Sequence, residues 1–203
     1  DAVTIEKAQA WLKELLATSP IEVAVVGDLP RERAVELVAK YLGSLPARDR
    51  VTETTLAAER KLARPSEAKT LRRDVTTTTD QGTVFVGFYG PDAWNEADAR
   101  AMGLAGRVLS SRMIDEIREK AQLVYSIRAA SSPGDVFPGF GVFSASSTTQ
   151  PGKADALVAK IGEMFAEFAK DGPTEVEMGV AKLQIAKTFE TSVRQQGYWM
   201  GAL

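Results

Sequence analysis

Neither cysteine nor histidine occurs among the 203 residues of the chain. Without cysteine, disulfides, thiolate nucleophiles and cysteine-bound zinc are excluded. Without histidine, the chain lacks Ser–His and Cys–His nucleophile pairs, the usual general base near neutral pH and the nitrogen ligands that zinc commonly takes in proteins. Any hydrolytic chemistry in which the chain takes part must therefore use a catalytic group from outside it, and we expect no metal bound by its own residues.

A strong net charge and long apolar runs are also missing. The 25 basic residues nearly balance the 27 acidic ones, so the chain has no field of one sign of the kind that nucleic acid or an anionic membrane requires. No apolar run reaches the roughly 20 residues of a membrane span, and the N-terminus has no signal-peptide pattern. We therefore expect neither a nucleic-acid partner nor a membrane span.

The chain begins at Asp1 and not at a methionine. We interpret this start as a processed product or as an excised piece of a longer protein. The sequence leaves the compartment unknown, although the processed start and the lack of cysteine suggest a bacterial periplasm or cell envelope.

The composition is that of a soluble globular protein, with 44% hydrophobic and 26% charged residues. A chain of this length can bury one sizeable core. We expect a single domain over residues 1–203, with its core at about 20–190. The segment at about 47–65 is polar and has no sustained period, which is typical of a flexible surface connection.

Helical and strand periods alternate along the chain. The predicted helices cover about 5–16, 30–43, 94–117, 157–168 and 174–183. The predicted strands cover about 21–28, 68–75, 82–90, 123–129 and 137–147. These elements predict an α+β fold with a largely antiparallel sheet of about five or six strands. The helices should pack mainly on one face of the sheet, which leaves the other face for a cleft.

Three local patterns make sharper predictions. Both alternating sets of strand 82–90 lack charge, which favours a central strand that is covered on both faces. Asp28 precedes a helix, where a side-chain cap is expected. The last predicted helix should begin with a capping box at Thr174 and Glu177, and its apolar face should contain Val176, Val180 and Leu183.

The order of these parts resembles a known family over almost the whole chain. The segments that carry the resemblance are IEVAVVGDLPRERAVELVAKYLGSLP, VFVGFYGP, LSSRMIDEIREKAQLVYSI, GFGVFSASS and GPTEVEMGVAKLQ. Together they resemble the C-terminal half of an insulinase or pitrilysin-type zinc metallopeptidase, including bacterial and mitochondrial processing-peptidase-like members. The resemblance implies a preceding half with an inverted H-x-x-E-H zinc motif, and a peptide substrate enclosed between the two halves. It therefore places the zinc ion on the partner half.

Two residues match a site of that family. In its second half an arginine, followed seven residues later by a tyrosine, faces the zinc site, and Arg118 and Tyr125 match this pair in type and spacing. Val124 stands where the family often has glycine. The resemblance implies that the Tyr125 phenol stabilises the negative charge that develops on the scissile carbonyl oxygen. Arg118 would hydrogen-bond substrate carbonyls or hold the phenol in place.

The strand that follows offers a second set of candidates. Phe140, Gly141 and Phe143 lie in a segment that is dense in glycine and phenylalanine, where another backbone can approach closely. We interpret the stretch 140–147 as an edge that an extended substrate can join by β-augmentation. A purely structural alternative is a twisted or bulged strand beside a close neighbour.

Each candidate has a structural alternative. Tyr125 shares a strand face with Leu123 and Ile127, so that on local pattern alone it is a half-buried strand tyrosine. Arg118 alone is a solvated cation at the C-terminal end of a helix. The carboxylates of Asp115, Glu116 and Glu119 fall partly on different helix faces, and we assign them no chemistry.

Two hypotheses of different classes remain. In the first, the chain is the substrate-binding half of a zinc metalloendopeptidase, with the H-x-x-E-H motif on a missing half or on another subunit. In the second, it is a non-catalytic structural or assembly subunit with the same fold. The sequence decides neither the substrate and its cleavage preference nor whether the assembly is a homo- or hetero-oligomer. It assigns no enzymatic activity to the chain alone.

Overall fold

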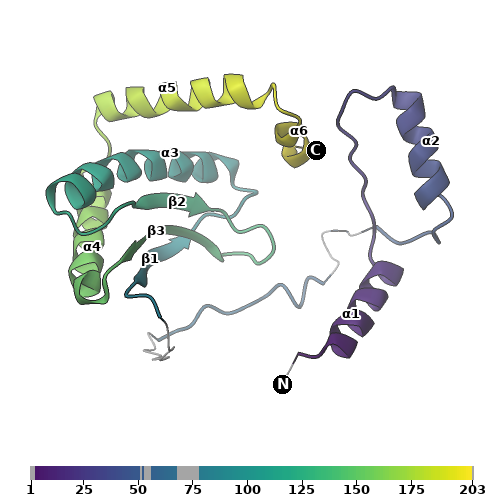
Figure 1. Ribbon diagram of the computed structural model, residues 1–203, viewed down its shortest axis with the longest axis horizontal. Helices are drawn as coiled ribbons and strands as arrows, with labels where there is room; N and C mark the ends of the chain where they lie inside the picture. Colours follow the sequence, from purple (N-terminus) through teal and green to yellow (C-terminus); the bar gives the residue numbers. More distant parts are fainter. Residues whose placement is uncertain (1–2, 51, 53–55, 68–77, 203) are drawn as a thin grey trace. The chain divides into compact units, whose positions relative to one another are not determined.

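The computed structural model describes residues 3–50, 52, 56–67 and 78–202. The chain forms two compact units, one made of residues 1–57 and 187–203 and the other of residues 58–186. The first part of the chain contains α1 (Ile5–Thr18) and α2 (Arg31–Leu42). Then follow β1 (Gly82–Gly90), α3 (Glu96–Met113), the π-helical segment η1 (Ile114–Lys120), β2 (Arg128–Ser132), β3 (Gly141–Thr149), the 3₁₀ turn η2 (Pro151–Lys153), α4 (Ala154–Asp171), α5 (Glu175–Ser192) and α6 (Gln196–Ala202) (Figure 1).

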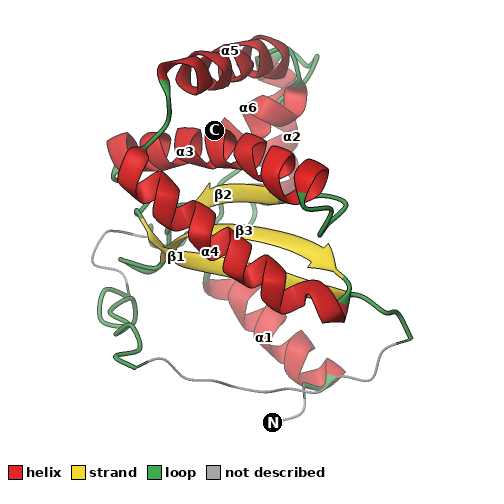
Figure 2. Cartoon of the chain, turned by 90° about the vertical axis from the view of Figure 1, so that its left-hand side faces the viewer, coloured by secondary structure: helices red, strands yellow, loops and turns green. Residues whose placement is uncertain are grey.

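The unit 58–186 is built on an antiparallel sheet with the strand order β1-β3-β2. In this register Phe88 lies opposite Phe143, and Ala145 lies between Val86 on one side and Ala129 on the other. Helices α3 and α4 cover one face, with α3 along β2 and α4 against β1 (Figure 2). The predicted α+β class, the antiparallel pairing and the helices on one face are confirmed.

The core of this unit lies between the sheet and the two helices. Its buried side chains are apolar and come from every element of the layer: Val84, Leu109, Met113, Ile117, Ile127, Ala129, Phe143, Ala145, Leu157, Ile161, Met164 and Phe165. Gly106 lets α3 approach β2 closely, because a Cβ atom there would lie 3.2 Å from the Ala130 Cα. Burial of this many apolar side chains stabilises the unit mainly through the hydrophobic effect.

An ion pair fixes the start of α5 to α3. Both ends of the Arg112 guanidinium contact the Glu177 carboxylate, at 2.5 and 2.7 Å, and one nitrogen also donates to the Gly172 carbonyl. The Glu177 carboxylate accepts from the Thr174 amide at 2.7 Å, and the Thr174 hydroxyl accepts from the Glu177 amide. The predicted capping box is therefore confirmed. The hydrogen bonds from Arg112 are the largest cause that lowers the pKa of Glu177 to about 2.

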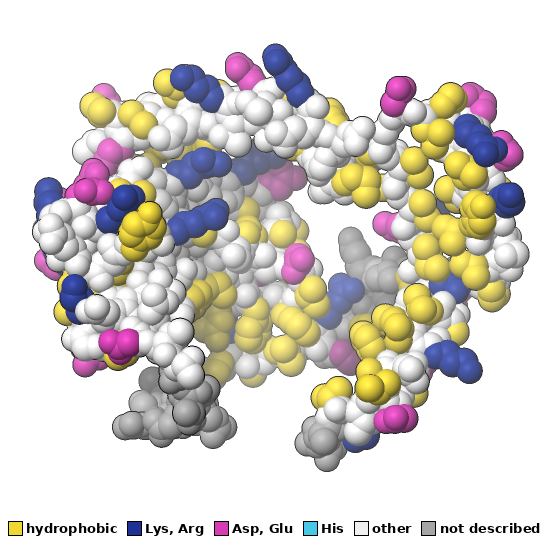
Figure 3. Space-filling model, viewed as in Figure 1, with side chains coloured by type: hydrophobic (Ala, Val, Ile, Leu, Met, Phe, Trp, Pro, Cys, Tyr) yellow, Lys and Arg dark blue, Asp and Glu magenta, His cyan; other side chains and the backbone are white. Residues whose placement is uncertain are grey.

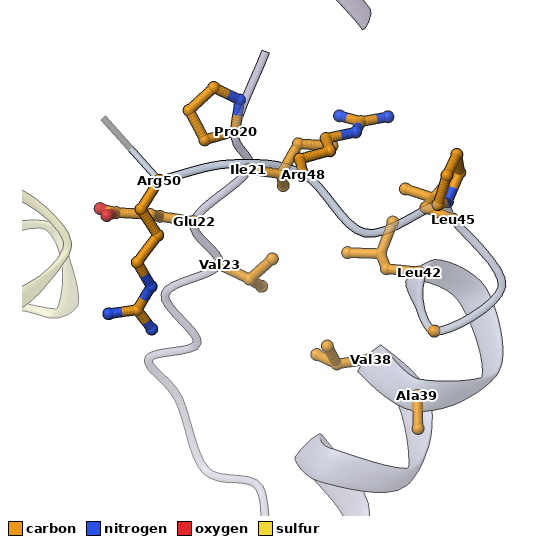
Figure 4. Close-up of a pocket in the computed structure, with 12 residues that line it drawn as sticks. Pro20, Ile21, Glu22, Val23, Val38, Ala39, Leu42, Leu45, Arg48 and Arg50 are labelled. Atoms are coloured by element: carbon orange, nitrogen blue, oxygen red, sulfur yellow. The ribbon is translucent and has the colours of Figure 1, made fainter. Parts of the chain in front are cut away.

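The described part of the other unit has no buried side chain. Helix α1 is capped by the Thr4 hydroxyl, and the Arg48 guanidinium donates to the carbonyls of Leu16 and Ser19 at its C-terminal end. Apolar side chains lie on the surface of α1 and α2 (Figure 3). Segment 20–23 and α2 line a groove of about 940 Å³, whose walls combine apolar side chains with Glu22, Arg48 and Arg50 (Figure 4). This unit therefore displays the apolar faces that its sequence pattern predicts, and they are uncovered within it.

The number of strands is lower than predicted, with three in the described residues. The predicted strand 68–75 lies outside those residues. Segment 21–26 forms no strand ladder with any described residue, and a strand requires a partner. The predicted strand 123–129 begins only at Arg128, and the strand predicted over 137–147 runs over 141–149.

Two finer predictions were wrong. In the described sheet β3 is central and β1 is at the edge, with the Phe85 side chain 64% exposed on the uncovered face. Helix α2 begins after Pro30 without a side-chain cap, so Asp28 is not its cap. On α5 the predicted apolar face with Val176, Val180 and Leu183 is exposed, and Ala181 is the buried residue of this helix.

Candidate functional site

Arg118 and Tyr125 flank the transition from a helix to the sheet. Helix α3 continues without a break into η1, and Arg118 lies in the last turn of η1. In a π-helix each amide bonds to the carbonyl five residues earlier, one residue further than in an α-helix. The Ala121 amide makes such a bond of 3.1 Å to the Glu116 carbonyl. Segments of π-helix are rare and occur frequently at functional sites. Gln122 follows with a φ of 51°, which turns the chain out of the helix.

Tyr125 is displayed on the surface of the unit. Its side chain is 86% exposed, and the structure shows no hydrogen bond from its hydroxyl to any described residue. The Arg118 guanidinium lies over the ring, 5.6 Å from its centroid. The interpretation of Tyr125 as a half-buried strand tyrosine is therefore wrong, because residues 122–127 leave the sheet and take the ring away from the core.

Arg118 has little to hold it apart from this ring. Its Nε lies 3.3 Å from the carboxylate of the adjacent Glu119, and both side chains are largely exposed. Exposed ion pairs of this kind contribute little to stability. On either side of Arg118 in the sequence, Glu116 and Lys120 form a pair at 2.6 Å, whose hydrogen bond lowers the pKa of Glu116 and raises that of Lys120. The guanidinium of Arg118 therefore keeps most of its donors available to a ligand.

The second predicted set is packed into the protein. Phe143 is 5% exposed, and its ring contacts that of Phe165 with the centroids 5.7 Å apart. A Cβ atom at Gly141 would lie 2.0 Å from the Pro91 carbonyl oxygen, so this glycine serves a close backbone approach. Strand β3 pairs with β1 on one side and with β2 on the other. The prediction that β3 offers a free edge for β-augmentation is wrong.

Phe140 belongs to a cluster that holds the loop between β2 and β3, called the loop clasp below and made of Arg64, Tyr89, Asp92, Gly139 and Phe140. The Phe140 ring packs edge-on against Tyr89, with the centroids 5.7 Å apart. The Arg64 guanidinium lies 4.3 Å from the Tyr89 ring centroid and donates to the Gly139 carbonyl. Both carboxylate oxygens of Asp92 accept from the Gly139 amide, at 2.8 and 2.9 Å. The loop is therefore fixed by a cation, a carboxylate and packed rings.

The two predicted sets lie at opposite ends of β3. The Tyr125 turn is bonded to Ser147 and Thr149 at the C-terminal end of the strand, whereas Gly141 begins it. At about 3.4 Å per residue, the six to eight residues between them span roughly 20–27 Å. The structure brings Arg118 and Tyr125 together and does not bring Phe140, Gly141 or Phe143 to them.

Zinc does not fit the residues of this chain. The sequence has no histidine and no cysteine. Within residues 3–50, 52, 56–67 and 78–202, no group of three or more acidic side chains lies close enough to hold a metal ion. In the same residues no helix combines the length and the apolar character that crossing a membrane requires.

The residues that hold the Tyr125 turn and the β2–β3 loop were not predicted from the sequence. The hydroxyls of Ser147 and Thr149 bind the backbone on both sides of Tyr125. A signal was present, because polar residues continue the alternation of Phe143 and Ala145 on a strand face that is otherwise apolar. Arg64 had no such signal, since its partners lie 25 and 75 residues further along the chain.

The chain matches a family model described as the peptidase M16 inactive domain over residues 2–185. Among curated proteins it is 28% identical over 184 residues to an uncharacterized zinc protease of Mycobacterium leprae, covering 89% of this chain and 40% of that protein. It is also 28% identical over 163 residues to an uncharacterized zinc protease of Mycobacterium tuberculosis, covering 79% of this chain and 36% of that protein. The chain thus spans about two-fifths of the length of these relatives.

Solved structures show the same fold. A peptidase M16 inactive domain from Pseudomonas fluorescens has a TM-score of 0.67 at 24% identity, covering 91% of this chain and 43% of that one. A protease from Helicobacter pylori has a TM-score of 0.63 at 19% identity, covering 87% and 42%. The family match extends over most of the chain and confirms the resemblance to the C-terminal half of insulinase-type peptidases. The chain belongs to the peptidase M16 inactive-domain family, a non-catalytic half associated with zinc proteases.

Proposed function

We propose that this chain is the substrate-binding half of a zinc metalloendopeptidase and that it supplies Arg118 and Tyr125 to the peptide-cleaving site. The H-x-x-E-H motif and its zinc ion would lie on another half or subunit, because this chain has no histidine or cysteine and its described residues contain no acidic cluster that could hold a metal ion. The domain would comprise residues 1–203, and together with the other half it would enclose the peptide in a chamber. Membership of a family of non-catalytic protease halves supports this assignment.

The exposure of Tyr125 is the observation that carries the proposal. Large aromatic side chains are usually at least half buried, and a tyrosine that is 86% exposed contributes little to folding. This one is nevertheless held by a cation over its ring and by a turn that is bonded to the sheet on both sides. An ordered phenol with a free hydroxyl suits a group that acts on a ligand.

The chemical role follows from the phenol. Peptide-bond hydrolysis places a negative charge on the carbonyl oxygen of the tetrahedral intermediate. The Tyr125 O–H would donate a hydrogen bond to this oxygen, and the bond would be stronger in the transition state than in the substrate. Such a donor raises kcat and has little effect on substrate binding. It needs no proton transfer, so an ordinary phenol is sufficient.

Arg118 would act on the same substrate. A guanidinium has five donors in a fixed plane, and the Arg118 group uses one of them on Glu119. It would bind carbonyl oxygens of the peptide and keep the Tyr125 ring in its orientation through the cation–π contact. Of the second predicted set, Phe140 is partly exposed and is a candidate for a peptide contact at the far end of β3.

The test compares two tyrosines that each lie under an arginine. Tyr125→Phe and Tyr89→Phe are made in the full-length protein together with the half that carries H-x-x-E-H, and cleavage of a fluorogenic peptide is followed. Loss of an oxyanion donor is expected to lower kcat by about 10²–10³-fold for Tyr125→Phe with KM nearly unchanged. Tyr89→Phe should stay within about twofold, because the Tyr89 ring packs in the loop clasp.

The result separates the two classes of function. Equal kcat in Tyr125→Phe and in the wild type, with both assemblies folded and loaded with zinc, would reject the catalytic role. The chain would then be a structural or assembly subunit with this fold. The same outcome would follow if no H-x-x-E-H sequence exists upstream in the gene or in a co-purified subunit.

A further inference from the structure

The core-facing side of β3 changes from apolar to polar along its length. Phe143 and Ala145 belong to the apolar core, and the next two positions on this face are Ser147 and Thr149. Both polar side chains are buried, at 7% and 6% exposure. Buried hydroxyls need hydrogen-bond partners, because an unsatisfied one costs free energy. The partners of these two hydroxyls therefore show what the polar positions do.

Both hydroxyls donate to the backbone beside Tyr125. The Ser147 hydroxyl lies 2.5 Å from the Ser126 carbonyl oxygen, and the Thr149 hydroxyl lies 2.7 Å from the Leu123 carbonyl oxygen. A longer contact of 3.1 Å joins the Ser147 hydroxyl to the Thr148 carbonyl. Because a hydroxyl has one proton, the shorter contact is the bond that counts. The two carbonyls flank Tyr125 on either side.

These bonds take the place of a strand ladder. Pairing between β2 and β3 begins at Arg128, which lies opposite Ser146. A strand continued in this register would put Tyr125 opposite Thr149, flat against β3. Residues 122–127 instead form no ladder, and the side chains of β3 bind their carbonyls. The chain thus turns outward at Tyr125 while it remains attached to the sheet.

The neighbouring side chains complete this arrangement. Leu123 and Val124 pack against the core cluster, and Ile127 is part of it. The Tyr125 ring is therefore exposed, whereas the apolar residues before and after it pack against the core. The backbone on each side of Tyr125 is held by a hydroxyl of β3.

We infer that Ser147 and Thr149 are positioning residues for the Tyr125 hydroxyl. This inference rests on the proposed function, in which that hydroxyl binds the carbonyl oxygen under attack. The two residues do not touch the substrate. They fix the carbonyls on both sides of the tyrosine, and small misplacements of a catalytic group lower the rate strongly.

A spectroscopic experiment tests the positioning without any activity. The full-length protein is labelled with 3-fluorotyrosine, and the resonance of Tyr125 is identified as the ¹⁹F line that Tyr125→Phe removes. In Thr149→Val, which keeps the shape and removes the hydroxyl, this line should shift or broaden. In Thr149→Ser, which restores a hydroxyl, it should return towards its wild-type position and width. Ser147→Ala should act in the same direction as Thr149→Val.

A matched control separates positioning from general loosening of the sheet. The Ser110 hydroxyl donates to the Ala129 carbonyl and accepts from the Ala129 amide, both at 2.9 Å, and so ties α3 to β2 away from the Tyr125 turn. Ser110→Ala removes a partly buried hydroxyl of the same kind. It should lower stability about as much as Ser147→Ala and leave the Tyr125 line unchanged.

Kinetics with the zinc-bearing half provide the second arm. Thr149→Val should lower kcat by about 10-fold with KM within about twofold, and it should add nothing further in a Tyr125→Phe background. Ser110→Ala should leave kcat unchanged. If the ¹⁹F line moves but kcat does not, the positioning is supported and the catalytic role of Tyr125 fails. If the line stays fixed in both Thr149→Val and Ser147→Ala, the inference is overturned, whatever Tyr125→Phe does to the rate.

Discussion

Two arginine–tyrosine pairs in the same unit have the same contact and different surroundings. In the Arg64–Tyr89 pair the cation also donates to the Gly139 carbonyl. The Tyr89 ring packs against Phe140, and Tyr89 is 47% exposed. In the Arg118–Tyr125 pair the structure shows, within the described part of the chain, contacts of the cation with the ring and with the carboxylate of the adjacent Glu119, and the phenol is almost fully exposed. The first pair closes a loop, and the second leaves its phenol exposed at the surface.

A third arginine shows that stacking on a ring does not indicate function. Arg112 lies over Phe168 at 5.1 Å, and it also forms the paired contact with Glu177. Its role is to attach α5 to α3. Arg64 and Arg112 stack on a ring and also bond to groups 60 or more residues away in the sequence, so they hold separate parts of the fold together. Arg118 differs because most of its donors remain available, and this difference can be tested residue by residue.

The largest expected effect belongs to the packed end of β3. Phe143→Ala removes a ring from the core and leaves a cavity, so the free energy of unfolding should fall by about 3–5 kcal/mol. Tyr125→Ala, which also removes an aromatic ring, should change it by less than about 0.5 kcal/mol. Urea titration measures both. A similar loss of unfolding free energy in the two variants would contradict the assignment of Phe143 to the core and of Tyr125 to the surface.

The Arg112–Glu177 pair should rank next. Glu177→Gln removes a charge from a doubly contacted, largely buried pair, and we expect a loss of about 1.5–3 kcal/mol. Glu177→Gln should also change the pH dependence. The folded pKa of about 2 lies below the ordinary value of 4.5 for a glutamate, so the stabilisation is complete above about pH 4.5 and disappears as pH falls towards 2.

Unfolding of the wild type and of Glu177→Gln is followed from pH 7 to pH 2.5. The difference in unfolding free energy between the two should shrink as pH falls below about 4.5, because the Glu177 carboxylate is then protonated in the unfolded chain before it is protonated in the folded one. A difference that stays constant over this range would mean that the charge of Glu177 does not stabilise the fold.

Loss of the loop clasp should have a smaller effect. Arg64→Met keeps the apolar stem and removes the cation, so that the hydrogen bond to Gly139 and the contact with Tyr89 are lost. We expect a loss of about 1 kcal/mol. Faster proteolytic cleavage between Gly134 and Gly139 should accompany it. Arg118→Met is the matched variant, and its unfolding curve should coincide with that of the wild type.

Among these variants, Arg118→Lys should have the smallest effect, and the effect should appear in kcat/KM. Arg118→Lys keeps the charge and removes the planar donor set, so kcat/KM should fall about fivefold, the equivalent of about one hydrogen bond. Steady-state kinetics in the assembled peptidase measure this change. Turnover equal to that of the wild type would mean that Arg118 acts as a simple point charge, without planar contacts to the peptide.

The helices were the part of the fold that the sequence predicted well. Their apolar faces repeat over several turns, and the capping box at Thr174 lies within four residues, so that the information is local. The exposed face of α5 is the exception. Val176, Val180 and Leu183 have the period of a buried face, and burial depends on what lies opposite the helix.

The strands were harder to predict because their partners are distant in sequence. Leu123, Tyr125 and Ile127 alternate as in a strand, but Thr149 and Ser147 bind the backbone of this segment with side chains in place of a ladder. The family resemblance paired Arg118 with Tyr125, and in the structure the guanidinium lies 5.6 Å from the ring centroid. The resemblance did not predict that the ring would be displayed, since that depends on hydroxyls more than 20 residues away.

The most direct measurement of the central claim uses an inhibitor that resembles the tetrahedral intermediate. A peptide whose scissile carbonyl is replaced by a phosphinyl group is titrated against the wild-type assembly and the Tyr125→Phe assembly. If the hydroxyl binds the oxyanion, Tyr125→Phe weakens this inhibitor by about the 10²–10³-fold by which it lowers kcat, while the affinity for an uncleaved peptide changes by less than about threefold. Equal affinity of both assemblies for the phosphinyl peptide would contradict the claim.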